Sequence, residues 1–478
     1  MRRLLLGIVL SIGLVLSGCG KDDDTSCELG TSDGCSSGQV CELVDGEAAC
    51  VQPVVIRGAV FDLASDEAVA GARVVALDAN GAPRTDVAIT DADGNYTLDV
   101  RVDRAGDGSP VQDLLTLRVA AQGYQPYPRL PRPAIPVDLS VATPDETDEV
   151  RVVENAATRV GLIALEGDVA SLGRISGRVS LSSAVTASAG GVLVLAEVGG
   201  EARSSAVTAG DGTFEVFNVP AGSVVVSGYA AEMNVAPESV TVPSGGAVTD
   251  VVLEATADGL AAVTGSVQIV AAGCASTTSV ILVAEATLEE LVPGNDAFVR
   301  GEAPIGLRAG DISGAFRIEG VAPGRYAVLA AFENDCLTRD PDGGIAGTDL
   351  VVIEVPGDVD VVEAGSFKVT QAIEVVYPGA TGLEIVTDAT PVFRFQRMPS
   401  IDRYELRVFD AFGNLVHEDL NVPQPGGNAP VEWTYDGPAL EDGMIYQFRV
   451  LSVALNSDEY RNATEDLLGV FLFEADGE

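Results

Sequence analysis

The sequence contains very few of the basic side chains on which many catalytic and nucleic-acid-binding sites depend. Its 478 residues include one histidine, His417, and two lysines, Lys21 and Lys368, and aromatic residues make up 5%. Asp and Glu number 71 against 28 Lys and Arg, which gives a formal net charge of -43. Nucleic-acid affinity depends on cations that neutralise phosphates, and a multi-histidine metal site needs several histidines. The composition therefore excludes a nucleic-acid partner and a metal site of that kind.

The N-terminus has the pattern of an export signal. Two arginines follow the first Met, and residues 4–16 form an apolar run too short to cross the ~30 Å hydrocarbon core of a bilayer comfortably. A Leu-Ser-Gly triplet then precedes Cys19, which resembles the lipobox of bacterial lipoproteins. The resemblance implies that a signal peptide over residues 1–18 is removed and that Cys19 carries palmitate-type acyl chains, which anchor the protein to a membrane. An ordinary secretory signal with a chance cysteine is the alternative.

The residues after Cys19 bear on its destination. Gly20 follows the cysteine, whereas lipoproteins retained at the inner membrane typically have Asp there, so the resemblance favours the outer membrane. Lys21 and the three aspartates after it form an acidic tether. Such a run resembles a surface-export signal of some bacteria, and a plain hydrophilic spacer is the alternative. The expected location is the cell envelope, lipid-anchored at the outer membrane, on either its periplasmic or its surface-exposed side.

The six remaining cysteines indicate disulfide bonds in an oxidising compartment. Residues 19–53 are expected to form a lipidated tether followed by a Cys-rich stub. Four of the cysteines lie in this stub, which has little apolar sequence: Cys27, Cys35, Cys41 and Cys50. We expect two bridges within this stub, with all three pairings open, and a further bond between Cys274 and Cys336. A zinc site built from the four stub cysteines is the alternative, although their spacing lacks the paired CxxC of zinc ribbons.

From residue 54 onward the pattern is all-β. Hydrophobic residues make up 47% of the chain, which argues against disorder, and short apolar runs with period two are broken by Gly, Asp, Asn and Pro. Three stretches are similar to one another: 54–166, 174–256 and 260–366, the last with an insertion around residues 289–307. Each has a glycine in its first apolar run and an aromatic residue after a later turn. These pairs are Gly58 and Tyr96, Gly177 and Phe214, and Gly265 and Phe316.

The first copy resembles carboxypeptidase regulatory-like domains. It contains G-A-V at 58–60, G-A-R-V at 71–74 and T-D-A-D-G-N-Y at 90–96, in that order. These domains are transthyretin-like β-sandwiches that accompany enzymes without carrying catalytic residues. The resemblance therefore implies three tandem, non-catalytic sandwiches. Related pilin domains form Lys–Asn crosslinks, but with lysine only at 21 and 368 no such crosslink is expected inside the copies.

The last stretch, 372–478, resembles a fibronectin type III domain. Leu440, a turn at Gly443 and Tyr446 entering a strand follow the pattern of a tyrosine corner. The resemblance implies a fourth β-sandwich. We expect Trp433 to lie in its core rather than to form a ligand platform.

Two places offer candidate chemistry. His417 lies beside two acidic residues in a short strand, with no coherent nucleophile and base set around it, so we expect an exposed strand histidine and no enzyme; an unrecognised hydrolase is the alternative. Asp340, Asp342 and Asp349 lie in a glycine-containing loop and are the best calcium candidate, with a solvated turn as the alternative. No other cofactor is expected.

Taken together, the sequence predicts a lipid-anchored, non-catalytic envelope protein. Four sandwiches in a row would form a rod that holds its tip away from the membrane. Its partners would be the membrane, through the N-terminal lipid, and a glycan, peptide or protein bound by its loops. An accessory subunit of a secreted hydrolase or export system is the alternative.

Overall fold

The computed structural model describes residues 27–129, 132, 134–270, 276–288, 301–330, 336–339, 350–455 and 460–475. Regular structure in these residues is almost entirely strand, with four short 3-10 helices, which confirms the all-β prediction. Within the same residues no helix has the length and apolar character needed to cross a bilayer. The signal peptide with Cys19, the cysteine Cys274 and the calcium candidates Asp340, Asp342 and Asp349 all lie outside the described residues.

The described part of the chain begins with the Cys-rich stub, which is followed by a first sandwich. The stub is one hairpin, β1 (Val40–Val44) and β2 (Glu47–Val51). In the first module, one sheet has the order β11-β3-β10-β9, with β6 also paired to β3, and the other has the order β5-β4-β7-β8. The strands are β3 (Val54–Asp62), β4 (Arg73–Leu77), β5 (Ala88–Ile89), β6 (Asn95–Val100), β7 (Leu114–Ala120), β8 (Pro136–Asp138), β9 (Thr143–Pro144), β10 (Arg151–Val153) and β11 (Arg159–Leu162). The 3-10 turns η1 (Leu139–Val141), η2 (Ala156–Thr158) and η3 (Val169–Ser171) lie between later strands.

The second module is a single curled sheet of order β14-β13-β16-β17-β18-β12-β15, whose end strands β14 and β15 contact each other around one core. Its strands are β12 (Gly173–Leu181), β13 (Leu193–Val198), β14 (Glu201–Val207), β15 (Thr213–Val219), β16 (Gly222–Ala230), β17 (Met233–Val242) and β18 (Ala247–Thr256).

The third module pairs a sheet of order β22-β19-β26-β24 with one of order β21-β20-β23-β25. Its elements are β19 (Ala261–Val270), β20 (Thr278–Ala284), η4 (Glu285–Thr287), β21 (Arg308–Ile312), β22 (Ala315–Val321), β23 (Gly324–Ala330), β24 (Leu337–Arg339), β25 (Val351–Val355) and β26 (Val361–Gln371).

The fourth module packs the sheet β27-β29-β32 on the sheet β28-β35-β33-β30-β31, with β34 also paired to β33. Its strands are β27 (Val375–Tyr377), β28 (Glu384–Val386), β29 (Val392–Phe395), β30 (Ile401–Asp410), β31 (Leu415–Pro423), β32 (Val431–Thr434), β33 (Ile445–Ala454), β34 (Tyr460–Ala463) and β35 (Val470–Phe473). Tyr446 Oη accepts a hydrogen bond from the Glu441 backbone N–H (2.8 Å), the kind of contact that a tyrosine corner makes.

The glycine and aromatic pairs of the three repeats are direct partners across neighbouring strands. Tyr96 lies opposite Gly58, Phe214 opposite Gly177 and Phe316 opposite Gly265, as the register of β3 with β6, β12 with β15 and β19 with β22 shows. In each copy the aromatic side chain covers the glycine so closely that an added Cβ would collide with it. The first strand of each copy also pairs in parallel with a late strand: β3 with β11, β12 with β18 and β19 with β26. The repeats therefore share one central arrangement.

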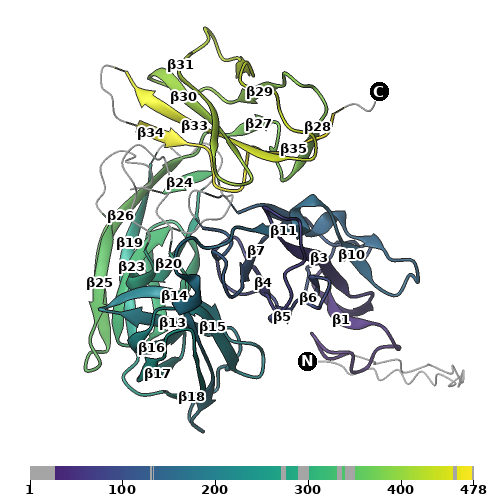
Figure 1. Ribbon diagram of the computed structural model, residues 1–478. Helices are drawn as coiled ribbons and strands as arrows, with labels where there is room; N and C mark the ends of the chain where they lie inside the picture. The colour runs from purple at the N-terminus through teal and green to yellow at the C-terminus, as the bar shows by residue number, and fades with distance from the viewer. Residues whose placement is uncertain are drawn as a thin grey trace, which may run out of the picture.

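The four modules do not stand in a row, so the predicted rod is wrong. Figure 1 shows the fourth module above the others, the first on the right, and the second and third on the left. The first module contacts the second through Asn218, whose Oδ1 accepts from Gly123 N–H (2.7 Å). The second contacts the third through Leu193, Leu195 and Ala284, which share one buried cluster.

Two further junctions close the arrangement. The third module contacts the fourth through hydrogen bonds such as Cys336 N–H to Glu465 Oε1 (2.9 Å) and Asn462 Nδ2 to Gln371 O (2.6 Å). The fourth contacts the first through an apolar cluster in which Ile445, Val470 and Leu472 belong to the core of the first module. The modules thus form a closed ring (Figure 1), because outward-facing strand positions are apolar enough to be buried by a neighbouring module.

Candidate functional site

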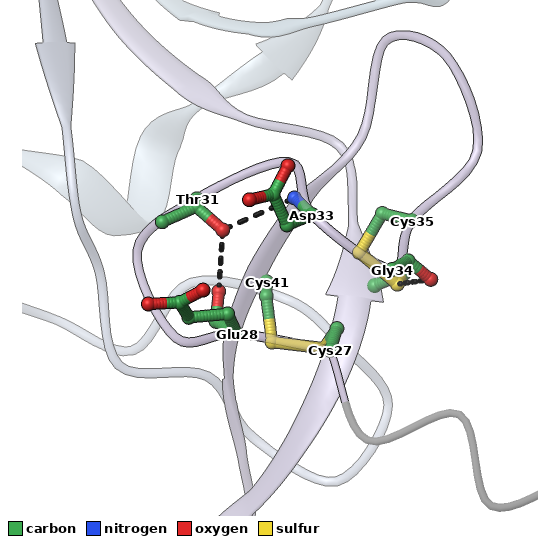
Figure 2. Close-up of a disulfide and its surroundings, with 8 residues drawn as sticks. Cys27, Glu28, Thr31, Asp33, Gly34, Cys35 and Cys41 are labelled. Atoms are coloured by element: carbon green, nitrogen blue, oxygen red, sulfur yellow. Dashed lines mark hydrogen bonds between the residues drawn. A yellow bond between two sulfur atoms is a disulfide. The ribbon is translucent and has the colours of Figure 1, made fainter.

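The cysteines of the stub form two disulfide bonds. Cys27 is bonded to Cys41 and Cys35 to Cys50, and Figure 2 shows both bonds close together at the start of the described chain. Three of these sulfur atoms lie within 4.8 Å of one another, but sulfur held in a disulfide is not a thiolate and cannot ligate zinc. Cys336 is also disulfide-bonded, to a partner outside the described residues.

The stub is fastened to the first module by a buried ion pair. Arg104 Nε donates to Glu42 Oε2 (2.6 Å), and the two side chains are 1% and 4% exposed. Arg104 also donates to the backbone oxygens of Gln52 (2.6 Å) and Gly108 (2.9 Å), so its charge is well satisfied. Burial raises the pKa of Glu42, and the contacts with Arg104 offset only part of that effect. The stub is therefore a rigid extension of the first module.

His417 belongs to an aromatic cluster of the fourth module. Its Nε2 lies 2.9 Å from Asp436 Oδ1, and its ring stacks on Trp433 at 5.6 Å between centroids. Trp433 is buried, packs on Phe393 and donates from Nε1 to Asp419 Oδ2 (3.0 Å), so it is a core residue. His417 is half-buried rather than exposed as the sequence suggested, because the rings beside it cover one of its faces.

A cavity of about 460 Å³ lies where the four modules meet. Its lining comes from all of them, with Arg118 from the first, Ser205 from the second, Glu302 from the third and Leu467 from the fourth. This volume is in the range of ~300–1,000 Å³ that is usual for small-molecule sites. The cavity is the candidate functional site of this protein.

Three polar side chains from three modules meet in the cavity wall. Arg118 Nη2 donates to Ser205 Oγ (2.7 Å) and lies 3.3 Å from both carboxylate oxygens of Glu302. Ser205 in turn donates to Glu302 Oε1. Arg118 and Glu302 are 12% and 34% exposed, so this ion pair is only partly removed from water.

The period of the strands places these groups in the cavity. In β7 the residues Leu115, Leu117 and Val119 are buried inside the first sandwich, so Arg118 emerges on its outer face. Arg73 lies on the same face, because the register places it opposite Ala120 on β4 and β7. Burial lowers the pKa of Arg73, and the charge of Arg118 is a smaller cause in the same direction. Both guanidinium groups lie on one sheet face.

Apolar side chains form much of the remaining wall. Leu77 and Tyr127 come from the first module, Leu193 and Phe217 from the second, and Leu467 from the fourth. Tyr127, Leu193, Phe217 and Leu467 are all nearly fully buried. The cavity therefore combines apolar surface with a polar cluster, which is typical of sites for small organic ligands.

The sequence analysis missed this site. Arg118, Ser205 and Glu302 occupy strand and loop positions, and the sequence of each module taken alone predicts that they face solvent. A signal was present in the uninterrupted apolar runs 192–196 and 280–284, since a strand that faces water on one side alternates. In the structure every residue of β20 is buried, because both of its faces are covered.

Comparisons with known proteins give no family for this chain. No protein-family model matches it, and neither does any curated protein. Solved structures with some likeness include the TIE protein of Bacillus anthracis, with 10% identity over 85% of this chain and 68% of that one and a TM-score of 0.15. BcpA, the major pilin subunit of Bacillus cereus, has 9% identity over 67% of this chain and 100% of its own, with a TM-score of 0.18.

A third similar structure is a DUF3823 family protein from Bacteroides uniformis, with 14% identity over 45% of this chain and 100% of that one and a TM-score of 0.20. Identities and scores this low do not transfer a function. The functional argument therefore rests on the residues and contacts of the chain itself.

Proposed function

We propose that this chain is a lipid-anchored, non-catalytic protein of the bacterial cell envelope that binds a ligand between its modules. The observation that carries the proposal is the disulfide-stapled stub. Disulfides such as Cys27–Cys41 and Cys35–Cys50 persist in oxidising compartments, which supports export. The stub begins only a few residues after Cys19, so an acylated Cys19 would attach the ring to the membrane through a short tether.

The rigid stub supports an anchoring role. A free spacer would need no buried contact with the first module, yet Arg104 and Glu42 form one and the backbone of Asp45 bonds to Arg104 O (3.1 Å). The stub thus fixes the point at which the lipid tether would join the ring, at the first module.

A non-catalytic role fits the polar groups of the described residues. His417 contacts Asp436 and aromatic rings, and no serine or cysteine among the described residues is hydrogen-bonded to it. The Ser205 hydroxyl lies beside Glu302 and Arg118, which form an ion pair rather than a general base for a nucleophile.

Fractionation of cells that carry Cys19→Ser tests the anchor. We expect the variant to leave the membrane fraction and appear in the soluble envelope or medium, because the acyl chains supply the membrane affinity. Cys336→Ser is a matched control that should stay with the membrane. Unchanged membrane fractionation of Cys19→Ser would refute the anchor, and protease treatment of intact cells then assigns the anchored form to the outer surface or the periplasm.

A further inference from the structure

Arg118 presents unused hydrogen-bond donors at the central cavity. Only its Nη2 is engaged, with Ser205 and Glu302, and its Nε and Nη1 have no hydrogen-bond partner among the described residues. A guanidinium group offers five donors in a planar fork. Arg118 lines the cavity and keeps 12% of its side chain exposed, so its unengaged N–H groups can donate to a molecule inside the cavity.

The charge of the cavity lining differs sharply from that of the chain. The whole sequence has 71 acidic residues against 28 Lys and Arg. The cavity lining has three of each sign: Arg118, Arg129 and Arg203, with Asp78, Glu302 and Asp466. The balanced lining lets an anion approach without the repulsion that it meets elsewhere on this protein.

From these observations we infer that the cavity binds a small organic carboxylate, whose carboxylate group accepts from the unengaged Nη1 N–H groups of Arg118. This inference rests on the proposed binding function and names its ligand class. The body of the ligand lies against the apolar wall that includes Leu77 and Phe217. All four modules line the cavity, so the site exists only while the ring is closed.

The charge and the apolar part of the lining favour an organic carboxylate over a phosphate. A phosphate dianion would face the carboxylates of Glu302, Asp78 and Asp466 with twice the charge. The apolar wall also needs an organic body to cover it, which inorganic anions lack.

Titration of the full chain in detergent with matched probes tests this inference. Each pair differs only in the carboxylate: galacturonate against galactose, and N-acetylphenylalanine against its amide. We expect the acid of at least one pair to bind, and its neutral partner to bind about tenfold or more weakly, because a charge-assisted hydrogen bond contributes about 1.5–3 kcal/mol. The pair that responds shows whether a sugar acid or an amino-acid carboxylate fits the cavity. Calorimetry and ligand-observed NMR measure both.

Three variants locate the binding. Arg118→Gln should abolish binding of the acid, because it removes the charged fork. Glu302→Gln should strengthen binding, because it removes a competing carboxylate from Arg118. Asp86→Ala is the matched control: it removes a contact between the first and second modules, in which Asp86 Oδ1 accepts from Gly210 N–H (2.7 Å), and neither residue lines the cavity. The affinity of this control variant for the acid should stay unchanged.

Several results would overturn the inference. It is wrong if no acid binds at millimolar concentration, or if acids and their neutral partners bind equally. It is also wrong if inorganic phosphate binds as tightly as the acids, or if Arg118→Gln and Asp86→Ala lose the same affinity, since the effect would then come from loosening of the ring. The anchoring proposal is tested separately by the Cys19→Ser fractionation, so the two can fail independently.

Discussion

The first module makes two very different junctions, one with the fourth module and one with the third. At the junction with the fourth module, Ile445, Val470 and Leu472 of the fourth module belong to the hydrophobic core of the first. Arg132 of the first module donates a hydrogen bond to Ala411 O (2.9 Å) across the same junction. Toward the third, the contacts are ion pairs, Arg118 with Glu302 and Arg308 with Asp78, at the side of a cavity.

The difference separates a structural junction from a functional one. Burial of apolar side chains stabilises an interface that is continuous with a core, and this stabilisation is lost only when the modules separate. Partly exposed ion pairs contribute little, typically 0–1 kcal/mol each, and they weaken with salt. The apolar junction therefore holds the ring together, while the ionic junction leaves charged groups accessible to a ligand.

Replacing Arg104 by Met tests whether burial, rather than ion pairing as such, decides the strength of a junction. The change leaves the Glu42 carboxylate without its partner, and we expect a loss of about 3–5 kcal/mol in the stability of the docked stub at neutral pH. Hydrogen exchange at the Asp45 N–H, which bonds to Arg104 O, measures this loss of stability. Glu42→Gln in the same chain should restore much of the loss, and failure of that rescue would contradict the explanation.

The same pair predicts a pH dependence. Because burial raises the pKa of Glu42 above its usual value of 4.5, the folded protein holds this proton more tightly than the unfolded chain does. The contribution of Glu42 to stability is therefore present below about pH 4.5 and is lost as pH rises through its raised pKa. In Arg104→Met this loss should extend to higher pH, because the contacts that lower the pKa are gone. Urea unfolding curves recorded across this pH range measure the effect, and a Glu42→Gln chain should not show this pH-dependent loss of stability.

Leu472→Ala attacks the apolar junction directly. Leu472 is buried in the core shared by the first and fourth modules, so we expect a loss of about 2–5 kcal/mol. Ile385→Ala in the neighbouring strand β28 is the control, because Ile385 is 57% exposed and should change stability by less than about 0.5 kcal/mol. Equal melting shifts for the two variants would argue against a fused core.

Arg308→Gln should have the smallest effect. The pair with Asp78 is partly exposed, so we expect a loss of about 0–1 kcal/mol that disappears as salt screens it. Chemical unfolding at low and high ionic strength measures the difference. A loss as large as that of Leu472→Ala would mean that the ionic junction, too, is structural.

The sequence was sufficient to predict the internal order of each repeat. Gly58 and Tyr96, like the two equivalent pairs, could be recognised because a glycine facing an aromatic ring is a local requirement of two adjacent strands. The turn at Asp91 could also be predicted, because an aspartate side chain often caps such a turn. In the structure Asp91 Oδ1 accepts from the backbone N–H groups of Asp93 (2.9 Å) and Asn95 (2.8 Å). Such features depend on neighbours in the same sandwich.

The ring and its cavity could not be predicted in the same way, because they depend on contacts between distant parts of the chain. Gln447 and Arg449 look like solvent-facing positions of an alternating strand. In the structure both are buried, and Gln447 donates to Asp466 O and Leu468 O (both 2.8 Å). Arg118 and Glu302 are 184 residues apart, and nothing in either local sequence indicates the other.

Small-angle X-ray scattering of the purified chain tests the closed ring most directly. A compact chain of this length has a radius of gyration of about 23 Å, and the ring predicts a value near that and a single-peaked distance distribution. Four sandwiches in a row would give a clearly larger radius and a distribution with a long tail. An elongated profile in low and high salt alike would contradict the ring, and with it the cavity that the ring encloses.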